Sequence, residues 1–128
     1  MDESVELTCA LIECRSVTPH DAGCMELIEE RLLPLGFATE HLDFGETRNL
    51  FMRHGAESPL LVFLGHTDVV PSGPEADWKH PPFNATIEGD LLYGRGAADM
   101  KSGVAAMVTA LARFTQSHPA HRGSVGIL

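Results

Sequence analysis

The sequence predicts an α/β domain whose helices pack on a mixed, largely parallel sheet. Segments of helical period alternate with segments of strand period, and residues 60–64 form an unbroken apolar run that ends at Gly65. Such a run is typical of a central strand that is covered on both faces. Helices interleaved with such a strand bury their apolar stripes against the sheet, and this arrangement defines the α/β class.

The first half of the chain is predicted to hold two helices followed by two strands. Apolar residues recur at helical spacing over residues 3–14 and again over residues 24–35, which predicts two amphipathic helices. Asp21 precedes the second helix and is its candidate N-cap. The hydrophobic period then shortens, which predicts strands over residues 37–42 and 49–53.

The second half is predicted to contain a loop, a hairpin, a helix and a last strand. Residues 71–82 include four prolines, so we expect a loop with Trp78 as its anchor. Two short apolar segments within residues 86–93 flank a Glu-Gly-Asp turn and predict a hairpin. An alanine-rich helix with a core stripe is predicted over residues 100–114, and a strand over residues 123–128.

Composition argues against several classes of protein and partner. The chain has 128 residues, of which 44% are hydrophobic and 21% charged, as expected for one soluble globular domain. A formal net charge of -9 repels phosphate backbones and anionic lipids, so we expect no nucleic acid and no membrane as partners. The three cysteines lack the spacing of a zinc or redox motif, and a cytoplasmic location is the simplest expectation.

The end of the apolar strand is the first place where chemistry is expected. Ligands collect at the carboxyl ends of strands in open α/β sheets, and His66 and Asp68 follow that end here. Residues two apart in an extended chain point to the same side, so Asp68 can orient the His66 ring. A metal-bound imidazole needs such a partner, although a lone His-x-Asp pair is more often a loop hydrogen bond.

A glycine-rich turn at residues 94–103 supplies a second candidate residue, Asp99. The glycine spacing matches neither common nucleotide-binding loop, and the Asp99 carboxylate would repel a phosphate. An aspartate at a helix start is usually an N-cap. The surrounding glycines indicate a backbone that bends sharply, so Asp99 is held in place and can bridge two cations.

Taken in order, these segments resemble the dinuclear zinc peptidase and deacylase family. The resemblance rests on residues 65–71 (GHTDVVP), Trp78, residues 81–83 (PPF) and residues 92–101 (LYGRGAADMK), and it extends over essentially the whole chain. It implies a three-layer sandwich and hydrolysis of an acylated amino acid at its amide bond. It also implies two zinc ions per full-length subunit, with cobalt as an alternative metal, a small-molecule substrate and a homodimer.

The resemblance also implies the roles of individual residues. His66 would bind one zinc ion, Asp99 would bridge both ions, and Asp68 would be the catalytic-site residue that orients His66. The peptide bond between Asp99 and Met100 would be cis. Residues 1–128 would form the N-terminal part of the metal-binding catalytic domain, with the catalytic glutamate, other ligands and the dimerisation domain beyond Leu128, so we expect the isolated chain to be inactive.

Other polar residues and other functions have less support. Arg95 and Lys101 could contact a substrate carboxylate, but solvated charges are the preferred interpretation. Two alternative functions stay open: a related deacylase with another acyl substrate, and a noncatalytic module that keeps the fold without the chemistry. Six further histidines are expected at the surface without metal-ligand spacing: His20, His41, His54, His80, His118 and His121.

Overall fold

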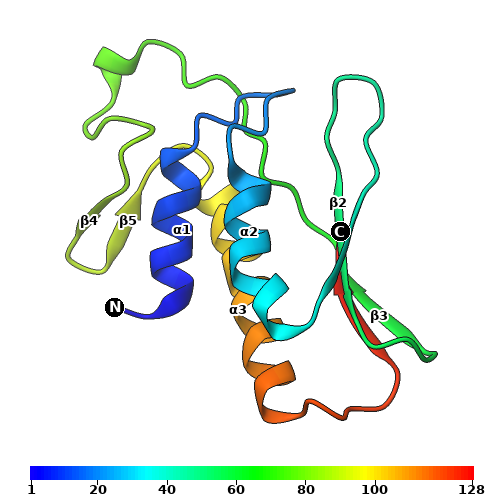
Figure 1. The fold of residues 1–128 in the computed structure, drawn as a ribbon. Coiled ribbons are helices and arrows are strands. Elements are labelled where there is room, and N and C mark those ends of the chain that lie inside the picture. The colour runs from blue at the N-terminus through cyan, green and yellow to red at the C-terminus, as the bar shows by residue number, and fades with distance from the viewer.

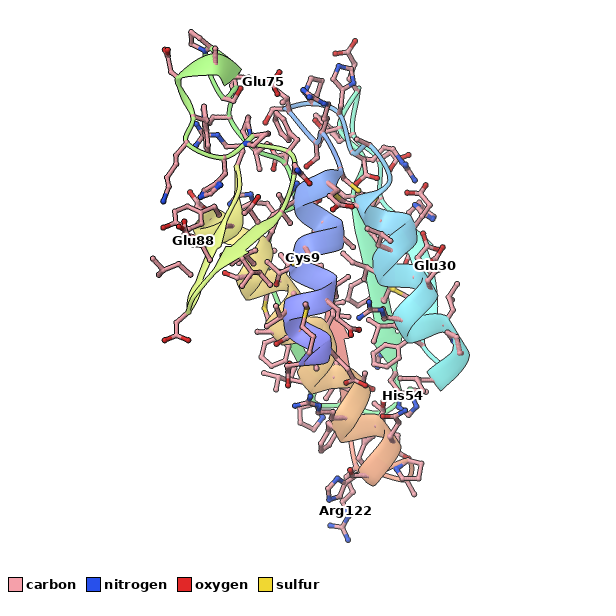
Figure 2. The ribbon with its side chains drawn as sticks, turned by 90° about the vertical axis from the view of Figure 1, so that its left-hand side faces the viewer. Cys9, Glu30, His54, Glu75, Glu88 and Arg122 are labelled. Atoms are coloured by element: carbon pink, nitrogen blue, oxygen red, sulfur yellow. The ribbon has the colours of Figure 1, made fainter.

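Three helices lie along one side of a four-stranded sheet in the computed structural model, which describes residues 1–128 (Figure 1). The helices are α1 (Glu3–Glu13), α2 (Cys24–Leu32) and α3 (Ser102–Ser117). Figure 2 looks onto α1 and α2, with the strands behind them. The three predicted helices are confirmed, although α3 begins slightly later than its alanine-rich segment suggests.

The main sheet has the strand order β1-β2-β6-β3. Its members are β1 (Ala38–His41), β2 (Leu50–His54), β3 (Leu60–Phe63) and β6 (Ser124–Ile127). β3 pairs parallel with β6, whereas β1 with β2 and β2 with β6 are antiparallel. The predicted α/β class and mixed sheet are therefore confirmed, and the parallel part consists of the β3–β6 pair.

A separate hairpin and the proline-rich loop complete the chain. β4 (Thr86–Glu88) pairs antiparallel with β5 (Leu91–Tyr93), as predicted. The loop before them contains a 3₁₀ turn over Glu75–Asp77, and the indole Nε1 of Trp78 donates a hydrogen bond of 3.0 Å to the carbonyl of Ser72. Trp78 is thus the anchor that the sequence predicts. Figure 1 shows the hairpin beside α1, with the main sheet beyond the helices.

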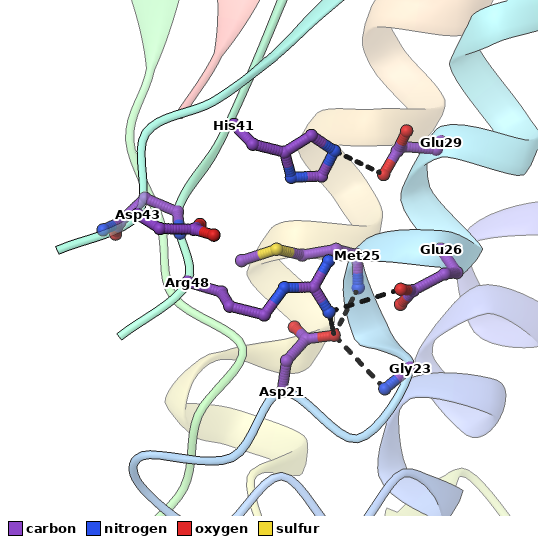
Figure 3. Close-up of polar contacts among 9 residues, drawn as sticks. Asp21, Gly23, Met25, Glu26, Glu29, His41, Asp43 and Arg48 are labelled. Carbon is purple, nitrogen blue, oxygen red and sulfur yellow. Dashed lines mark hydrogen bonds and ion pairs between the residues drawn. The ribbon is translucent and has the colours of Figure 1, made fainter. Parts of the chain in front are cut away.

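Asp21 caps the start of α2 and also joins it to the β1–β2 hairpin (Figure 3). Its Oδ2 accepts hydrogen bonds of 3.2 Å from the backbone N–H groups of Gly23 and Met25. Arg48 reaches across from the hairpin, with its Nη1 3.6 Å from Asp21 Oδ2 and 3.3 Å from Glu26 Oε1. The predicted capping role is confirmed, although Asp21 lies two residues before the helix boundary at Gly23.

The position of β3 corrects one prediction. The apolar run is a strand, but it lies at an edge of the sheet because β3 pairs with β6 alone. Leu61 is 59% exposed and Leu64 is 72% exposed, so the run is not covered on both faces. A continuous apolar pattern indicates that both faces of a strand can be buried. It does not specify whether other elements of the chain cover those faces. The chain forms two of the three expected layers.

The hydrophobic core lies between the helices and the sheet. Val104 and Leu111 on α3 are buried, and Met107 and the preceding Met100 pack against the core cluster, so the predicted core stripe is confirmed. No helix of the chain combines the length and the apolar character needed to cross a membrane. The fourteen residues of the core cluster are Leu7, Leu11, Cys24, Met25, Ile28, Leu32, Phe37, Leu50, Met52, Val104, Ala105, Val108, Leu111 and Ile127.

Candidate metal site

His66 follows the end of β3, where the chain passes close to α3 and to the turn before it. The N–H of Gly65 donates a hydrogen bond of 3.0 Å to the carbonyl of Leu128, so the chain stays extended beside β6 after β3 ends. A Cβ on Gly65 would lie 2.8 Å from Met107 Cε, which shows how closely the strand approaches the helix. Glycine at this point allows the approach and fixes the site at which His66 leaves the sheet.

Asp99 lies in a wide helical turn, Ala97–Lys101, that precedes α3. The turn begins after Gly96, which has a φ of +82°, and a Cβ there would collide with Val69. Asp99 has non-helical backbone angles, with φ -126° and ψ 94°, so it is not an ordinary N-cap. The peptide bond between Asp99 and Met100 is cis, as predicted.

These two segments bring the predicted site residues together. His66 Nε2 lies 3.1 Å from Asp99 Oδ1, although 33 positions separate the two residues. His66 Nδ1 lies 3.0 Å from the backbone carbonyl of Asp68 and 3.4 Å from its carboxylate Oδ1. Asp68 therefore contacts the imidazole as predicted, and its backbone makes the shorter contact.

The contacts of His66 fit a cation shared with Asp99. A neutral imidazole that donates from Nδ1 to the Asp68 carbonyl presents a lone pair at Nε2. In that tautomer the lone pair faces Asp99 Oδ1 at 3.1 Å, whereas a protonated Nε2 donates a hydrogen bond to this oxygen. Two ligands on one tetrahedral zinc ion are separated by about 3.3 Å, since each bond is about 2.0–2.1 Å. The spacing of these two atoms suits a bound metal ion.

The cleft around these residues is open, and its lining carries two carboxylates and one cation. It has a volume of about 470 Å³, and its lining includes His66, Asp68 and Asp99, with Arg95 as the cation among the lining residues. The side chains of His66 and Asp99 are 48% and 88% exposed, so a ligand can reach both. Carboxylates and an imidazole in a solvent-accessible cleft are a donor set that borderline and hard cations accept.

The chain provides only part of a metal coordination shell. No group of three or more His, Cys, Asp or Glu side chains is placed to hold one metal ion. His66 and Asp99 supply two candidate ligand atoms 3.1 Å apart, with Asp68 beside the imidazole.

The prediction that Arg95 and Lys101 are solvated charges is wrong. Lys101 is fully buried rather than solvated, and burial lowers the pKa of its ammonium group. Arg95 is half-buried, with its guanidinium carbon 4.9 Å from the ring centroid of Trp78. One signal could have identified Lys101 as buried: it lies three and seven positions before Val104 and Val108, on the same helical face as this core stripe.

The surface assignment of the remaining histidines is only partly correct. His20, His41 and His118 are exposed, whereas His54, His80 and His121 are half-buried. His54 Nδ1 lies 2.7 Å from His121 Nε2, and these residues come from β2 and from the segment before β6. Sequence spacing could not identify this pair, because 67 positions separate its members.

Comparisons with known proteins agree with this geometry. The model of peptidase family M20/M25/M40 matches residues 62–128. The chain is 59% identical over its whole length to the succinyl-diaminopimelate desuccinylase of Alkalilimnicola ehrlichii and 57% identical to that of Methylococcus capsulatus. It covers 34% of each relative, so the chain spans about a third of the length of the curated relatives it matches.

Solved structures show the same fold. A metallo-carboxypeptidase of the M20 family from Sulfolobus solfataricus superposes with a TM-score of 0.79 at 25% identity, over 99% of this chain and 30% of that one. Human carnosine dipeptidase 1 superposes with a TM-score of 0.82 at 24% identity, over 98% of this chain and 31% of that one. Metal dependence is thus a property of the family to which these proteins belong. The chain belongs to peptidase family M20/M25/M40.

Proposed function

We propose that residues 1–128 are the N-terminal, metal-binding part of the catalytic domain of a succinyl-diaminopimelate desuccinylase. The reaction is hydrolysis of N-succinyl-LL-2,6-diaminopimelate to succinate and LL-2,6-diaminopimelate, a step of lysine and diaminopimelate biosynthesis. The observation that carries the proposal is the 3.1 Å approach of His66 Nε2 to Asp99 Oδ1. The names of the relatives that are 53–59% identical support the substrate.

Each residue of the site has a role in this proposal. His66 would hold one zinc ion through Nε2, and Asp99 would hold two ions, because each of its two carboxylate oxygens can accept one. Asp68 holds the His66 ring through Nδ1, which fixes the tautomer and makes Nε2 the ligand atom. Two zinc ions, or cobalt in their place, supply Lewis acidity for the amide carbonyl and lower the pKa of bound water.

The wider setting belongs to the same proposal. Because the chain spans about a third of its relatives, the longer protein would contribute the general base, the remaining ligands and a dimerisation domain. In this proposal the longer protein is a cytoplasmic homodimer that acts on a small molecule, and the net charge of -9 disfavours nucleic acid as a partner. Two donors bind zinc weakly compared with the usual three or four protein ligands, so the isolated chain should be inactive.

A hybrid protein tests this proposal. Residues 1–128 would replace the matching third of the Alkalilimnicola ehrlichii desuccinylase, to which they are 59% identical. We expect the hybrid protein to release succinate from N-succinyl-LL-2,6-diaminopimelate, to lose this activity after chelation and to recover it with zinc. The isolated chain is the matched control and should release none.

Other outcomes would redirect or overturn the proposal. Faster hydrolysis of N-acetylornithine than of the succinyl substrate would assign a related function, acetylornithine deacetylase. A folded hybrid protein that hydrolyses neither substrate, with or without metal, would favour a noncatalytic module. Succinate release by the purified isolated chain, dependent on zinc, would contradict the expectation that these residues need the rest of the protein.

A further inference from the structure

We propose that Lys101 is a positioning residue for the metal site, because it fastens the turn that carries Asp99 to the end of α1. The inference goes beyond the function proposed above and rests on its metal site. Lys101 does not reach the cleft, so its effect must pass through the backbone of the turn. The structural case has three parts: the contacts of the ammonium, the closure of the turn and the shared attachment of His66.

The ammonium of Lys101 binds the C-terminal end of α1. Its Nζ donates hydrogen bonds of 2.5 Å to the carbonyl of Leu11 and 3.0 Å to the carbonyl of Cys14. The carbonyl of Leu11 also accepts the N–H of Cys14 at 3.2 Å, and a cation at this end of the helix meets the negative end of the helix dipole. α1 has no basic residue in its last turn, so Lys101 supplies this cation from 90 positions away.

The backbone of Lys101 closes the turn around Asp99. Its N–H donates a hydrogen bond of 2.9 Å to the carbonyl of Gly96, and the N–H of Ala97 donates one of 3.2 Å to the carbonyl of Gly94. Asp99 therefore lies inside a loop whose last residue is anchored by its own side chain. A lysine is almost never fully buried without a specific partner, and here the partner is another helix.

The same helix end also holds His66. Residues 14–18, which follow α1 and are called the connector here, run beside the segment after β3. Ser16 Oγ donates a hydrogen bond of 2.7 Å to the carbonyl of Thr67, and the Val69 N–H donates one of 2.9 Å to the carbonyl of Ser16. Thr18 Oγ1 donates to the carboxylate of Asp68.

Both halves of the metal site are thus attached to one segment. The connector holds the His66 segment through Ser16 and Thr18, and it holds the Asp99 turn through the carbonyl of Cys14 and Lys101. Metal ligands must be kept within about 0.5 Å of their productive positions. The geometry therefore makes Lys101 one of the two links that set the separation of His66 and Asp99.

Replacing Lys101 by methionine tests the link, since the variant keeps a long side chain and loses the donor. The chain has one other lysine, Lys79, which is exposed, so Lys79→Met is the matched control. Thr115→Val is a second control, because it removes a buried hydrogen bond of 2.9 Å within α3, away from the turn. It lowers stability without touching the link.

Two measurements read the effect of Lys101→Met. In the 128-residue chain without metal, amide hydrogen exchange at positions 97 and 101 should become about tenfold faster or more. In the hybrid protein, competition with a chelator should show zinc affinity reduced about tenfold to a hundredfold, as for residues that support metal ligands. The KM should change little while kcat falls. Both control variants should keep wild-type exchange at the turn and wild-type zinc affinity.

A milder variant, Lys101→Gln, is tested in the same way in case Lys101→Met does not fold. It keeps one shorter donor and should show a smaller loss of zinc affinity. Wild-type affinity and turn exchange in a folded Lys101→Met or Lys101→Gln variant would overturn the inference. So would an equal loss of affinity in Thr115→Val, because general destabilisation would then explain the effect. Failure of the wild-type hybrid protein to bind zinc would contradict the proposed function instead, and the exchange measurement would still test the link.

Discussion

Two histidines lie at strand ends of the sheet, and we propose a metal site at only one of them. His54 is the last residue of β2, and His66 follows β3. Because β2 is antiparallel and β3 parallel to β6, the carboxyl ends of β2 and β3 point to opposite ends of the sheet along the strand direction. At the β3 end, the imidazole of His66 lies 3.1 Å from the carboxylate of Asp99, and at the β2 end, the imidazole of His54 lies 2.7 Å from that of His121.

The identity of the partner decides what each end can bind. An imidazole nitrogen opposite a carboxylate oxygen leaves two acceptors that a cation can join. Two imidazoles in contact share one proton in a hydrogen bond, and protonation of both would place like charges together. Aromatic rings also pack at the His54 end. The ring centroids of Phe37 and His54 are 5.2 Å apart, and those of Phe114 and His121 are also 5.2 Å apart. A histidine at a strand end is therefore not sufficient for a site.

The largest expected effect separates the two histidines by activity. In the hybrid protein, His66→Ala should lower kcat/KM about a thousandfold or more, because metal catalysis supplies several kcal/mol of transition-state stabilisation. His54→Ala should keep activity within about threefold, since His54 lies at the opposite end of the sheet along the strand direction. Steady-state hydrolysis of the succinyl substrate measures both. Equal losses in the two variants would break the comparison.

The next largest effect comes from replacing a glycine near each histidine, Gly96 in the turn of Asp99 and Gly55 beside His54. Gly96 and Gly55 both have positive φ, of +82° and +95°, and a Cβ would collide with Val69 or with the carbonyl oxygen of Gly123. Gly96→Ala and Gly55→Ala should each lower the free energy of unfolding by about 2–4 kcal/mol. Gly89→Ala, with φ +62° and open space, should cost about 1 kcal/mol.

Metal binding then distinguishes the two destabilised variants. Gly96→Ala should weaken zinc binding by the hybrid protein because the turn of Asp99 must move, whereas Gly55→Ala should leave it unchanged. Urea denaturation measures stability, and competition with a chelator measures affinity. If both variants lost affinity in proportion to their stability, the site would depend on the fold as a whole rather than on the turn.

A smaller effect concerns pH and the His54 end. Burial and the nearby His121 lower the pKa of His54 below its ordinary value of 6.5. As the pH falls through 6.5 toward the folded pKa, the unfolded chain takes up a proton that the folded chain does not, so stability decreases. Well above pH 6.5 this contribution is constant.

Substitution of His54 tests that dependence. His54→Gln should flatten the decline in unfolding free energy between about pH 7 and about pH 5, and His20→Gln, an exposed control, should retain it. Urea denaturation across this range gives the slopes. An unchanged slope in His54→Gln would show that other groups control the pH dependence.

The smallest effect concerns β3, the exposed outer strand of the sheet. Leu61 on β3 is 59% exposed, and an apolar edge strand favours association with another chain. Leu61→Lys should reduce self-association of the 128-residue chain and change its stability by about 0.5 kcal/mol or less. Sedimentation at increasing concentration measures the first quantity. Equal self-association of the wild-type chain and the Leu61→Lys variant would mean that β3 is not the surface through which the chains associate.

Local patterns predicted the elements, and the resemblance to the zinc peptidase family supplied the candidate pair His66 and Asp99. Neither predicted the contacts that hold this pair in place. Periodicity located all three helices and the strands, because burial against one face imposes it on the sequence. The segments around His66 and Asp99 were identifiable because each belongs to a motif of consecutive residues that resembles the family. The two remaining features, the burial of Lys101 and the coverage of β3, depend on partners that are distant in sequence.

The energetic reason is the same in both cases. Lys101 would be a solvated charge by composition alone, and two carbonyls at the end of α1 make its burial tolerable. The apolar residues of β3 would be covered by composition alone, and the strand order leaves them at an edge. The residues next to Lys101 and to β3 in the sequence indicate neither the burial of Lys101 nor the exposure of β3. Tertiary contacts decide both.

Zinc titration of the 128-residue chain, followed by NMR, tests the central claim most directly. We predict that the imidazole resonances of His66 and the carboxyl resonance of Asp99 shift together with one dissociation constant. Asp99→Asn should weaken the response at His66, and the resonances of His54 and His121 should not move. Zinc shifts confined to His54 and His121, or a His66 response that Asp99→Asn leaves intact, would contradict a cation shared by positions 66 and 99.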